Sequence, residues 1–383
     1  MAAGKAAAGM AAAAARLLGD RLRGGVVAVP GAVQLAAPLE MIAGGHPVPT
    51  LGSRAAGERA LEIARAANAA DRLLVLLSGG ASALMAVPAD GVTLDDKRLT
   101  TDVLLRAGAD IHSLNAVRKH LSAFKGGWLA AEASAPCLTL AISDVVGDDL
   151  SVIGSGPTVA DATTFEHALD VLRRHGGMEA YPAAVGARLQ RGAAGRAPET
   201  PKPGDARLAR GASWVIGGRH DAMGGGADAA RRLGYRVLTI DEPVVGEARQ
   251  AAPAHVARVA ARAAALDRPL CVISSGETTV RVTGAGRGGR NQEFALAAAP
   301  TLAEFRTDAA AASVGTDGVD GPTDAAGAIV DSTTLARAQR AALRPQPFLD
   351  DNDAYAFFTV LGDLIRPGPT GTNVGDLQVI LLA

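Results

Sequence analysis

Short apolar runs alternate with longer alanine-rich stretches along most of the chain. The apolar runs are rich in Val, Leu and Ile and predict strands at 26–29, 73–77, 138–142, 214–216, 236–240, 270–273, 279–282 and 378–382. The alanine-rich stretches carry scattered arginines and predict helices at 5–18, 54–68, 94–106, 116–133, 165–174, 221–233, 247–265, 291–299 and 333–342. Strands separated by helices are typical of βαβ units. The pattern therefore predicts an α/β fold with a mostly parallel sheet that is buried on both faces.

One stretch, residues 191–212, interrupts this alternation. It is rich in proline, glycine and charged residues, a composition typical of linkers. The chain has 383 residues, whereas a typical domain has about 150. We therefore predict an N-terminal domain over 1–190, a linker over 191–212 and a C-terminal domain over 213–383.

Composition excludes several classes of protein. The net charge is −1 with 20% charged residues, which argues against a polybasic nucleic-acid-binding protein. No apolar run approaches the ~20 residues of a membrane span, and no signal-peptide pattern follows Met1. Cys137 and Cys271 lie in apolar strand-like runs and are expected to be small core residues without a disulfide. The sequence thus predicts a soluble, cytoplasmic protein.

A glycine-rich loop, Ser78-Gly79-Gly80-Ala81-Ser82, follows the predicted strand 73–77. Ligands in open α/β sheets bind beyond the carboxyl ends of the strands. Two glycines allow a tight turn that presents backbone N–H groups, and serines add hydroxyl donors, so the loop is suited to phosphate or carboxylate. The alternative is an ordinary strand-to-helix turn, since no Gly-Lys-Ser/Thr of a Walker A loop follows.

Lysine is rare and arginine replaces it almost everywhere; the lysines are Lys5, Lys97, Lys119, Lys125 and Lys202. Lys5 follows Gly4 at the start of a predicted helix, where it could reach a bound anion or simply be solvated. Asn115 and Arg118 share one face of another predicted helix, with Lys119 beside them. This second group is interpreted either as an anion site or as a solvated charged face.

Asp144 follows the predicted strand 138–142 directly. A carboxylate in this position could hold Mg²⁺, which takes one or two carboxylates and completes its shell with phosphate and water. The alternative is a turn stabilised by aspartate side chains. A second small-residue loop, containing Ser155 and Gly156, comes shortly after and favours a functional interpretation.

The C-terminal half has three further loops rich in glycine. Arg290 opens a predicted helix after Gly288-Gly289, where its guanidinium could bind carboxylate or phosphate in a bidentate manner. The loop 316–324 contains Asp317 and Asp320, whose spacing does not fit an EF-hand. The loop 368–373 contains Thr370 and Asn373. We expect the three loops to converge on one ligand.

His46 lies in a loop of glycines and prolines and is interpreted as a substrate ligand or a structural residue. The chain has no Cys/His cluster typical of zinc and no dinucleotide-binding fingerprint placed after a strand.

Eight motifs occur in order: GKAAAGM (4–10), GGHPVP (44–49), LSGGASAL (77–84), NAVRKHLSAFKGG (115–127), ISDVVGDDLSVIGSGPT (142–158), GGRNQE (288–293), GTDGVDGPTDAAGAIVD (315–331) and GPTGTNVGDL (368–377). Together they resemble the class II glycerate kinases of the glycerate 2-kinase type, which carry a C-terminal MOFRL domain. Some members of this family are named hydroxypyruvate reductase. The resemblance covers nearly the whole chain.

This resemblance implies a larger Rossmann-like N-terminal domain, a smaller α/β MOFRL domain and an active site in the cleft between them. It implies ATP- and Mg²⁺-dependent phosphorylation of D-glycerate to 2-phosphoglycerate, without nucleic-acid or membrane partners; a homodimer is also considered. Lys5 and Arg290 match the family's functional lysine and arginine and are the predicted catalytic residues. The predicted binding residues are His46, Ser78, Gly79, Gly80, Ser82, Asn115, Arg118, Lys119, Ser155, Gly156, Asn291, Glu293, Thr370 and Asn373. The predicted metal ligands are Asp144, Asp317 and Asp320.

One departure from the family keeps two alternatives open. Only Met1–Ala3 precede Gly4, so the first strand is expected to be missing and Lys5 to lie on a fraying terminus. The alternatives are a nicotinamide-dependent hydroxypyruvate reductase, which the missing dinucleotide fingerprint disfavours, and an inactive sugar-acid-binding protein, which the missing strand would favour.

Overall fold

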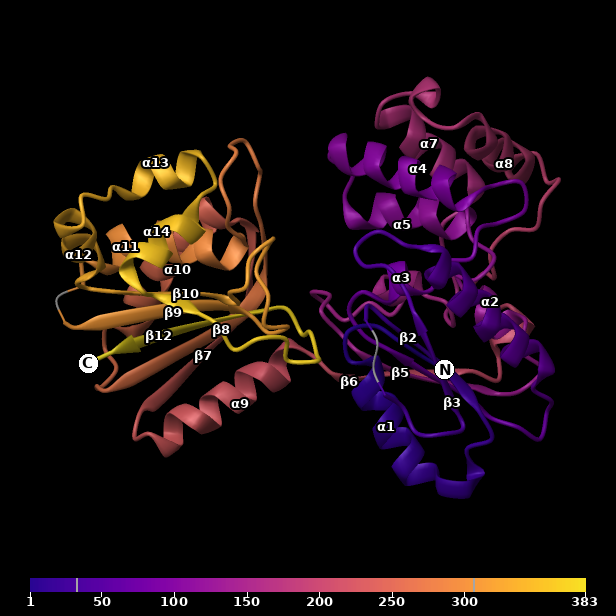
Figure 1. Ribbon diagram of the computed structural model, residues 1–383, viewed down its shortest axis with the longest axis horizontal. Coiled ribbons are helices and arrows are strands. Elements are labelled where there is room, and N and C mark those ends of the chain that lie inside the picture. Colours follow the sequence, from indigo (N-terminus) through magenta and orange to yellow (C-terminus); the bar gives the residue numbers. More distant parts are fainter. Residues whose placement is uncertain (32–33, 306) are drawn as a thin grey trace. The chain divides into compact units, whose positions relative to one another are not determined.

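The computed structural model describes residues 1–31, 34–305 and 307–383, which form two α/β units (Figure 1). The first unit comprises residues 1–143 and 147–216, and the second comprises 144–146 and 217–383. Each unit is built on its own six-stranded sheet. The predicted linker 191–212 thus lies inside the first unit, and the chain enters the second unit at residues 144–146 and again from residue 217 onward.

The first sheet has the strand order β3-β2-β1-β4-β5-β6. Its strands are β1 (Ala2–Ala3), β2 (Gly25–Val29), β3 (Leu39–Ala43), β4 (Leu73–Leu77), β5 (Cys137–Ile142) and β6 (Ala212–Gly217). The pairings among β1 to β5 are all parallel, which confirms the predicted arrangement for this unit. Figure 1 shows α1 (Ala7–Leu18) on one face of the sheet and α2 (Leu51–Ala66) on the other. Coverage of both faces explains why all five residues of β2 are buried.

The prediction that the first strand is missing was wrong. Ala2 pairs with Val27 of β2 and with Leu76 of β4, so β1 bridges two longer strands at the centre of the sheet. The Met1 amino group also donates a hydrogen bond to the Leu74 carbonyl at 2.7 Å. Two alanines carry no recognisable strand pattern, but two long neighbours supply all the hydrogen bonds that hold them.

The remaining helices of the first unit are α3 (Ala81–Leu84), α4 (Leu94–Arg106), α5 (Ile111–His120), α6 (Trp128–Ala131), α7 (Phe165–Arg174) and α8 (Ala183–Ala193). Four of them, α4, α5, α7 and α8, gather into a helical layer with its own apolar core (Figure 1). Leu104, Leu121, Phe165, Leu172 and Leu189 are buried there. The single helix predicted over 116–133 was wrong, because Gly126 and Gly127 adopt φ values of +60° and +86° that a right-handed helix cannot contain.

The second sheet has the order β11-β10-β9-β12-β8-β7 and is mainly antiparallel, with β7 and β8 as its parallel pair. Its strands are β7 (Arg236–Glu247), β8 (Leu270–Thr279), β9 (Ala309–Gly315), β10 (Gly327–Asp331), β11 (Leu364–Ile365) and β12 (Asp376–Leu382). The prediction of a mostly parallel sheet was therefore wrong for this unit. The separate strand predicted at 279–282 was also wrong, since β8 runs without interruption to Thr279.

Helices cover both faces of the second sheet (Figure 1). They are α9 (Arg219–Arg232) on one face, and α10 (Ala248–Ala263), α11 (Arg290–Leu302), α12 (Thr334–Arg340), α13 (Pro345–Asp350) and α14 (Ala354–Leu361) on the other. Alternate residues of β12 divide between the two cores: Val379 packs in the α9 cluster and Ile380 in the α11 cluster. This period of two is the pattern of a strand buried between two layers.

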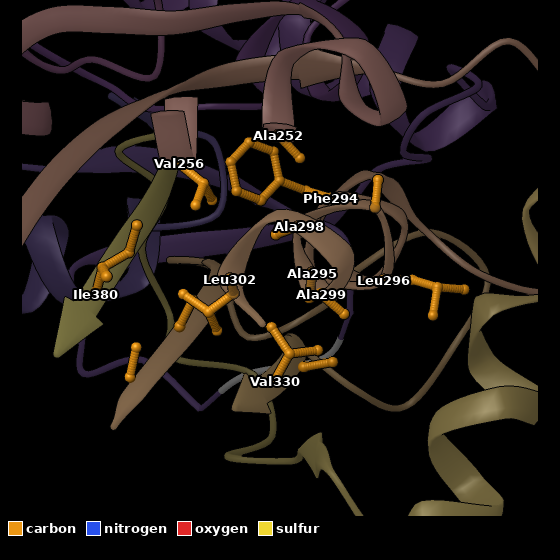
Figure 2. Close-up of a cluster of buried hydrophobic side chains, with 14 of the residues drawn as sticks. Ala252, Val256, Phe294, Ala295, Leu296, Ala298, Ala299, Leu302, Val330 and Ile380 are labelled. Atoms are coloured by element: carbon orange, nitrogen blue, oxygen red, sulfur yellow. The ribbon is translucent and has the colours of Figure 1, made fainter. Parts of the chain in front are cut away.

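Alanines form much of the larger core of the second unit. Figure 2 shows Ala295, Ala298 and Ala299 of α11 in one buried cluster with Phe294, Leu302, Val330 and Ile380, among other apolar residues. Small side chains let a helix lie close to its sheet, so a core with few aromatic residues is still filled. Both cysteines are free and buried, as predicted.

Candidate functional site

Lys5 lies in the short junction between β1 and α1, whose backbone is held by hydrogen bonds. Its backbone N–H donates to the Gly79 carbonyl at 2.9 Å, and the Ala6 N–H donates to Ser78 Oγ at 3.0 Å. Gly4 has a φ of +124°, and a Cβ there would lie 2.1 Å from Ser78 Oγ, so only glycine fits. The structure therefore brings Lys5 to the Ser78–Ser82 loop and holds its backbone firmly, in place of the expected fraying end.

His46 lies against the same loop. A Cβ on Gly80 would come within 3.0 Å of His46 Nε2, so the imidazole packs where Gly80 has no side chain. His46 is exposed to solvent. Three predicted residues, Lys5, His46 and Gly80, thus meet at the end of β4.

A chain of buried polar groups continues from this loop. Lys125 Nζ donates to Ser82 Oγ at 3.0 Å, Ser82 Oγ lies 2.8 Å from Ser155 Oγ, and Ser155 Oγ donates to Asn115 Oδ1 at 2.9 Å. The carbonyl of Gly156 accepts the Gly127 N–H at 2.7 Å. The hydroxyls of Ser82 and Ser155 therefore connect the two small-residue loops to α5, which is a scaffolding role.

Lys119 forms a buried ion pair with Asp161. Its Nζ lies 3.2 Å from Asp161 Oδ1, and the two side chains are 5% and 0% exposed. Burial raises the pKa of Asp161, but Lys119 and the hydrogen bonds of Thr163 outweigh burial and lower it. Thr200 also donates to Asp161, at 2.9 Å. The geometry assigns Lys119 to a structural ion pair in place of the predicted anion contact.

We expect Lys119→Met to lower the free energy of unfolding by about 3–5 kcal/mol, because it leaves the Asp161 carboxylate buried without a counter-ion. Urea denaturation measures this change. The double variant Lys119→Met/Asp161→Asn should recover much of the loss. A Lys119→Met protein as stable as the wild type would contradict the structural role.

Two lysines that the sequence analysis assigned to no site prove to be buried. Lys97 is 7% exposed and donates to the Leu121 carbonyl at 2.9 Å; Lys125 is 1% exposed and donates to the Ser82 carbonyl at 2.8 Å. Burial, assisted by the positive charge of Arg118, lowers the pKa of Lys97 to about 7. Burial and the charges of Lys97 and Arg118 lower the pKa of Lys125 well below its usual range. The rarity of lysine was the one sequence signal that could have identified them.

The pKa of Lys97 predicts how stability depends on pH. Between pH ~7 and pH ~10.5 the unfolded chain binds a proton at Lys97 that the folded protein has lost, so the free energy of unfolding should rise with pH. Each group of this kind contributes up to about 1.4 kcal/mol per pH unit in that window. Below pH ~7 the lysine is charged in both states and the slope vanishes.

Denaturant titrations of the wild type and Lys97→Met at pH 7, 8 and 9 measure this dependence. The variant should show a shallower rise, since its side chain does not titrate, although Lys125 still contributes. Parallel curves for the two proteins would contradict the shifted pKa.

In the second unit, Arg290 is the first residue of α11 and is held by two carboxylates. Its Nε donates to Asp376 Oδ2 at 2.8 Å and its Nη2 to Asp376 Oδ1 at 3.0 Å, while Nη1 lies 3.0 Å from Glu277 Oε1. Asp376 is 0% exposed, whereas Arg290 and Glu277 are 31% and 39% exposed at their side chains. The buried carboxylate therefore fixes the plane of the guanidinium, and its Nη1 edge faces the more accessible partner.

The electrostatics of this group favour the charged arginine. Burial lowers the pKa of Arg290, but Asp376 and Glu277 outweigh burial and raise it above its usual value. Burial raises the pKa of Glu277 to about 7, the charges of Asp144 and Asp376 raise it further, and Arg290 opposes them. The single positive charge of Arg290 thus faces two carboxylates, Asp376 and Glu277, and cannot neutralise both. Neither Glu277 nor Asp376 was among the predicted site residues, although Asp376 lies within the GPTGTNVGDL motif.

The three glycine-rich loops of the second unit contact one another; their convergence on one ligand stays a prediction. Gly318 has a φ of +86°, and a Cβ there would lie 2.0 Å from the Gly368 carbonyl oxygen; a Cβ on Gly321 would lie 2.1 Å from the Gly288 carbonyl oxygen. Both approaches require glycine. The loops that precede α11, follow β9 and precede β12 therefore touch one another.

Asp144 belongs to the second unit, although it follows β5 of the first. Asn373 Nδ2 donates to Asp144 Oδ2 at 2.7 Å. Asp317 accepts the Val319 N–H at 3.0 Å, and its carbonyl accepts the Thr370 N–H at 3.1 Å. The structure thus brings the loop 368–373 against two other loops, with Asn373 beside Asp144 and Thr370 beside Asp317.

Asp320 has a structural role at the start of α11. It is 2% exposed, and its two oxygens accept the N–H groups of Asn291 and Gln292 at 3.1 and 2.9 Å. A carboxylate at a helix N-terminus satisfies donors that have no partner within the helix. Burial raises the pKa of Asp320 to about 6, against these hydrogen bonds.

Asn291 and Glu293 also support the site from within the protein. Asn291 Nδ2 donates to Asp376 Oδ1 at 2.9 Å, and Asn291 Oδ1 accepts from Ser313 Oγ at 2.7 Å. Glu293 lies 2.6 Å from Arg249 Nη2 and is 3% exposed at its side chain. Asn291 therefore orients Asp376, and through it Arg290, whereas Glu293 ties α11 to α10.

The carboxylates fit a magnesium site only in part. Within residues 1–31, 34–305 and 307–383, no group of three or more His, Cys, Asp or Glu side chains could hold a metal ion. Mg²⁺ bound with a nucleotide needs only one or two carboxylates. Both oxygens of Asp320 are engaged by α11, so this predicted ligand has no free oxygen to offer a metal ion.

Comparison with known proteins agrees with this architecture. Residues 1–190 match the family described as "Domain of unknown function (DUF4147)", and residues 270–376 match the MOFRL family. The D-glycerate 2-kinase of Thermotoga maritima is 40% identical over 392 residues, covering 100% of this chain and 90% of that protein. A putative hydroxypyruvate reductase of Agrobacterium vitis is 39% identical and covers 99% of this chain and 86% of that protein. The crystal structure of glycerate kinase from T. maritima has a TM-score of 0.86, covering 100% of this chain and 91% of that structure.

The chain is a two-unit α/β protein whose C-terminal unit contains a MOFRL domain over residues 270–376. It belongs to the glycerate kinase family. In the described part of the chain, no helix has the length and apolar character needed to cross a bilayer.

Proposed function

We propose that this protein is a kinase that transfers the γ-phosphoryl group of ATP to D-glycerate. The observation that carries the proposal is the guanidinium of Arg290, fixed by the buried Asp376 within a chain of this family. We further propose that the acceptor is the 2-hydroxyl and that the product is 2-phosphoglycerate. The protein would act in the cytoplasm, where ATP is available, and its assembly as a homodimer is a prediction that light scattering can measure.

Positioning and charge neutralisation account for most of the catalysis of phosphoryl transfer. Arg290 Nη1 is paired with an accessible carboxylate, so a phosphoryl oxygen can replace Glu277 as its partner while Asp376 keeps the guanidinium in place. Lys5 supplies a second cation from a backbone that Gly79 and Ser78 hold. We propose that Lys5 and Arg290 each stabilise negative charge on a phosphoryl group.

Mg²⁺, when bound with the nucleotide, would neutralise charge on the phosphates. Asp144 and Asp317 are the residues proposed to hold it, because Asp320 is engaged by α11. Asn373 orients Asp144 through its hydrogen bond at 2.7 Å, and the Thr370 N–H fixes the main chain at Asp317.

³¹P NMR of a reaction with ATP, Mg²⁺ and D-glycerate tests the proposal. We expect ADP and a phosphomonoester on carbon 2. A resonance of 3-phosphoglycerate would correct the position, and no ADP formation would refute the kinase activity.

Hydroxypyruvate reduction is the second candidate, because a relative at 39% identity is named putative hydroxypyruvate reductase. A parallel reaction with NADH and hydroxypyruvate separates the two. Oxidation of NADH without any requirement for ATP would favour the reductase. Binding of D-glycerate in calorimetry without consumption of ATP or NADH would favour an inactive sugar-acid-binding protein.

A further inference from the structure

Three cations of the first unit form no ion pair with any carboxylate within residues 1–31, 34–305 and 307–383. Lys97 on α4, Arg118 on α5 and Lys125 after α5 influence one another, since the charge of Arg118 lowers the pKa of both lysines. The hydrogen bonds of the two lysines go to backbone carbonyls and to the Ser82 hydroxyl. We call these three residues the cation cluster.

The two residues that follow Arg118 on α5 both have carboxylate partners, in contrast to the cation cluster. Lys119 lies 3.2 Å from Asp161, and His120 Nε2 lies 3.2 Å from Glu199. Arg118 is half-buried, burial lowers its pKa to about 10, and among the described residues its guanidinium has neither a hydrogen bond nor an ion pair. A buried charge without a partner is costly, so proteins seldom retain one that binds nothing.

A second donor on the same helix also lacks an acceptor. Asn115 is 3% exposed, and its Nδ2 has no hydrogen-bond partner in the described structure. Its Oδ1 accepts from Ser155 Oγ, which fixes the amide so that Nδ2 is the free donor. Asn115 and Arg118 are three residues apart and share one face of α5. Unused donors and uncompensated positive charge therefore coincide on that face.

We infer that the face of α5 formed by Asn115 and Arg118, whose charge acts on Lys97 and Lys125, is a subsite for a compact oxyanion. A carboxylate or a phosphate would accept from the Arg118 guanidinium in a bidentate manner and from Asn115 Nδ2. It would also supply the negative charge that the cluster lacks. The identity of the anion rests on the proposed function: D-glycerate presents a carboxylate, and ATP presents phosphates.

The lowered pKa values of the lysines support this inference. Without an anion, part of the positive charge of the cluster is lost at neutral pH. A bound oxyanion favours the protonated lysines, so binding should be accompanied by proton uptake. Calorimetry in two buffers of different ionisation enthalpy measures that uptake directly and does not depend on turnover.

The test is calorimetric titration of the full chain with D-glycerate and, separately, with the non-hydrolysable ATP analogue AMP-PNP. Arg118→Met should lower the affinity for one of these ligands by about 10- to 100-fold, the effect of losing a hydrogen bond to a charged group. The affinity for the other ligand should stay within threefold of the wild-type value. Arg106→Met is the matched control, because Arg106 is an exposed arginine at the end of α4 whose side chain is 80% exposed. The control should change neither affinity.

Each result has a defined meaning. Loss of D-glycerate affinity identifies the acceptor's carboxylate as the anion, and loss of AMP-PNP affinity identifies a phosphate. Unchanged affinities, or equal loss of both ligands, would overturn the subsite. If Arg118→Met does not fold, Lys97→Met takes its place: it should reduce proton uptake and weaken the same single ligand, and unchanged uptake would equally refute the inference.

The experiment also separates this inference from the proposed function. If the wild type forms no ADP from ATP but Arg118→Met lowers the affinity for D-glycerate, the kinase activity is refuted and the anion subsite is supported. A wild-type protein that turns over while Arg118→Met binds both ligands normally would refute the subsite alone.

Discussion

Arg290→Met should lower kcat by about 10²- to 10³-fold, the effect of removing one preorganised charge from a developing transition state. The same substitution should also lower the free energy of unfolding by about 3–5 kcal/mol, because Asp376 is 0% exposed and loses its counter-ion. Steady-state assays at saturating ATP and D-glycerate measure the first effect, and urea denaturation the second.

A second variant separates catalysis from stability. In Arg290→Met/Asp376→Asn the buried charge is removed with its partner, and Asn291 can still donate to the amide oxygen at position 376. We expect most of the stability to return while kcat stays low. Recovery of kcat together with stability would mean that Arg290 serves only the fold, and a near-normal kcat in the single variant would exclude its catalytic role.

Lys5→Met should lower kcat by a similar 10²- to 10³-fold but leave the protein almost as stable as wild type. The difference from Arg290 is structural. The backbone of residues 4–6 is held by Gly79 and Ser78, so the conformation of this junction does not depend on the side chain of Lys5. The thermal midpoint and kcat of purified protein, compared with wild type, test both parts.

Arg16→Met on the same helix, α1, is the matched control. Arg16 is exposed and near the end of α1, so its loss removes one positive charge without touching the loop after β4. Its kcat should equal that of the wild type. If Lys5→Met and Arg16→Met behave alike, Lys5 has no role in the transfer, and the first unit's contribution would have to come from other residues.

The two predicted catalytic residues differ in how far their surroundings could be foreseen. For Lys5, the glycine before it and the glycine-rich loop after β4 were visible in the sequence, and the structure brings them together. For Arg290, the helix start was visible, but the partner carboxylates were not. Asp376 lies 86 residues away and Glu277 on another strand, and only the antiparallel pairing of β12 with β8 makes them neighbours.

Several predicted binding residues turned out to have internal partners for the same reason. Lys119 looked like an anion contact because the carboxylate that neutralises it, Asp161, lies 42 residues further along. Asp320 looked like a metal ligand because the N–H groups that it caps, on α11, precede it by 28 and 29 residues. Charge and spacing indicate where polar chemistry gathers, but not which buried groups are already paired.

The sequence by itself determined the local elements, including β4, α4 and α7 at their observed bounds, the positions of the glycine-rich loops and the resemblance to the glycerate kinases. These depend on contacts within one helix, strand or turn, so the period of apolar residues and the positions of glycine are sufficient. The tertiary structure alone decided that two alanines complete the first sheet, that the second sheet is mainly antiparallel, and that Arg118 lacks the partner that Lys119 has. Those outcomes depend on which distant segments are brought together in a low-dielectric interior, where an unpaired charge is costly and a short strand is stabilised by its neighbours.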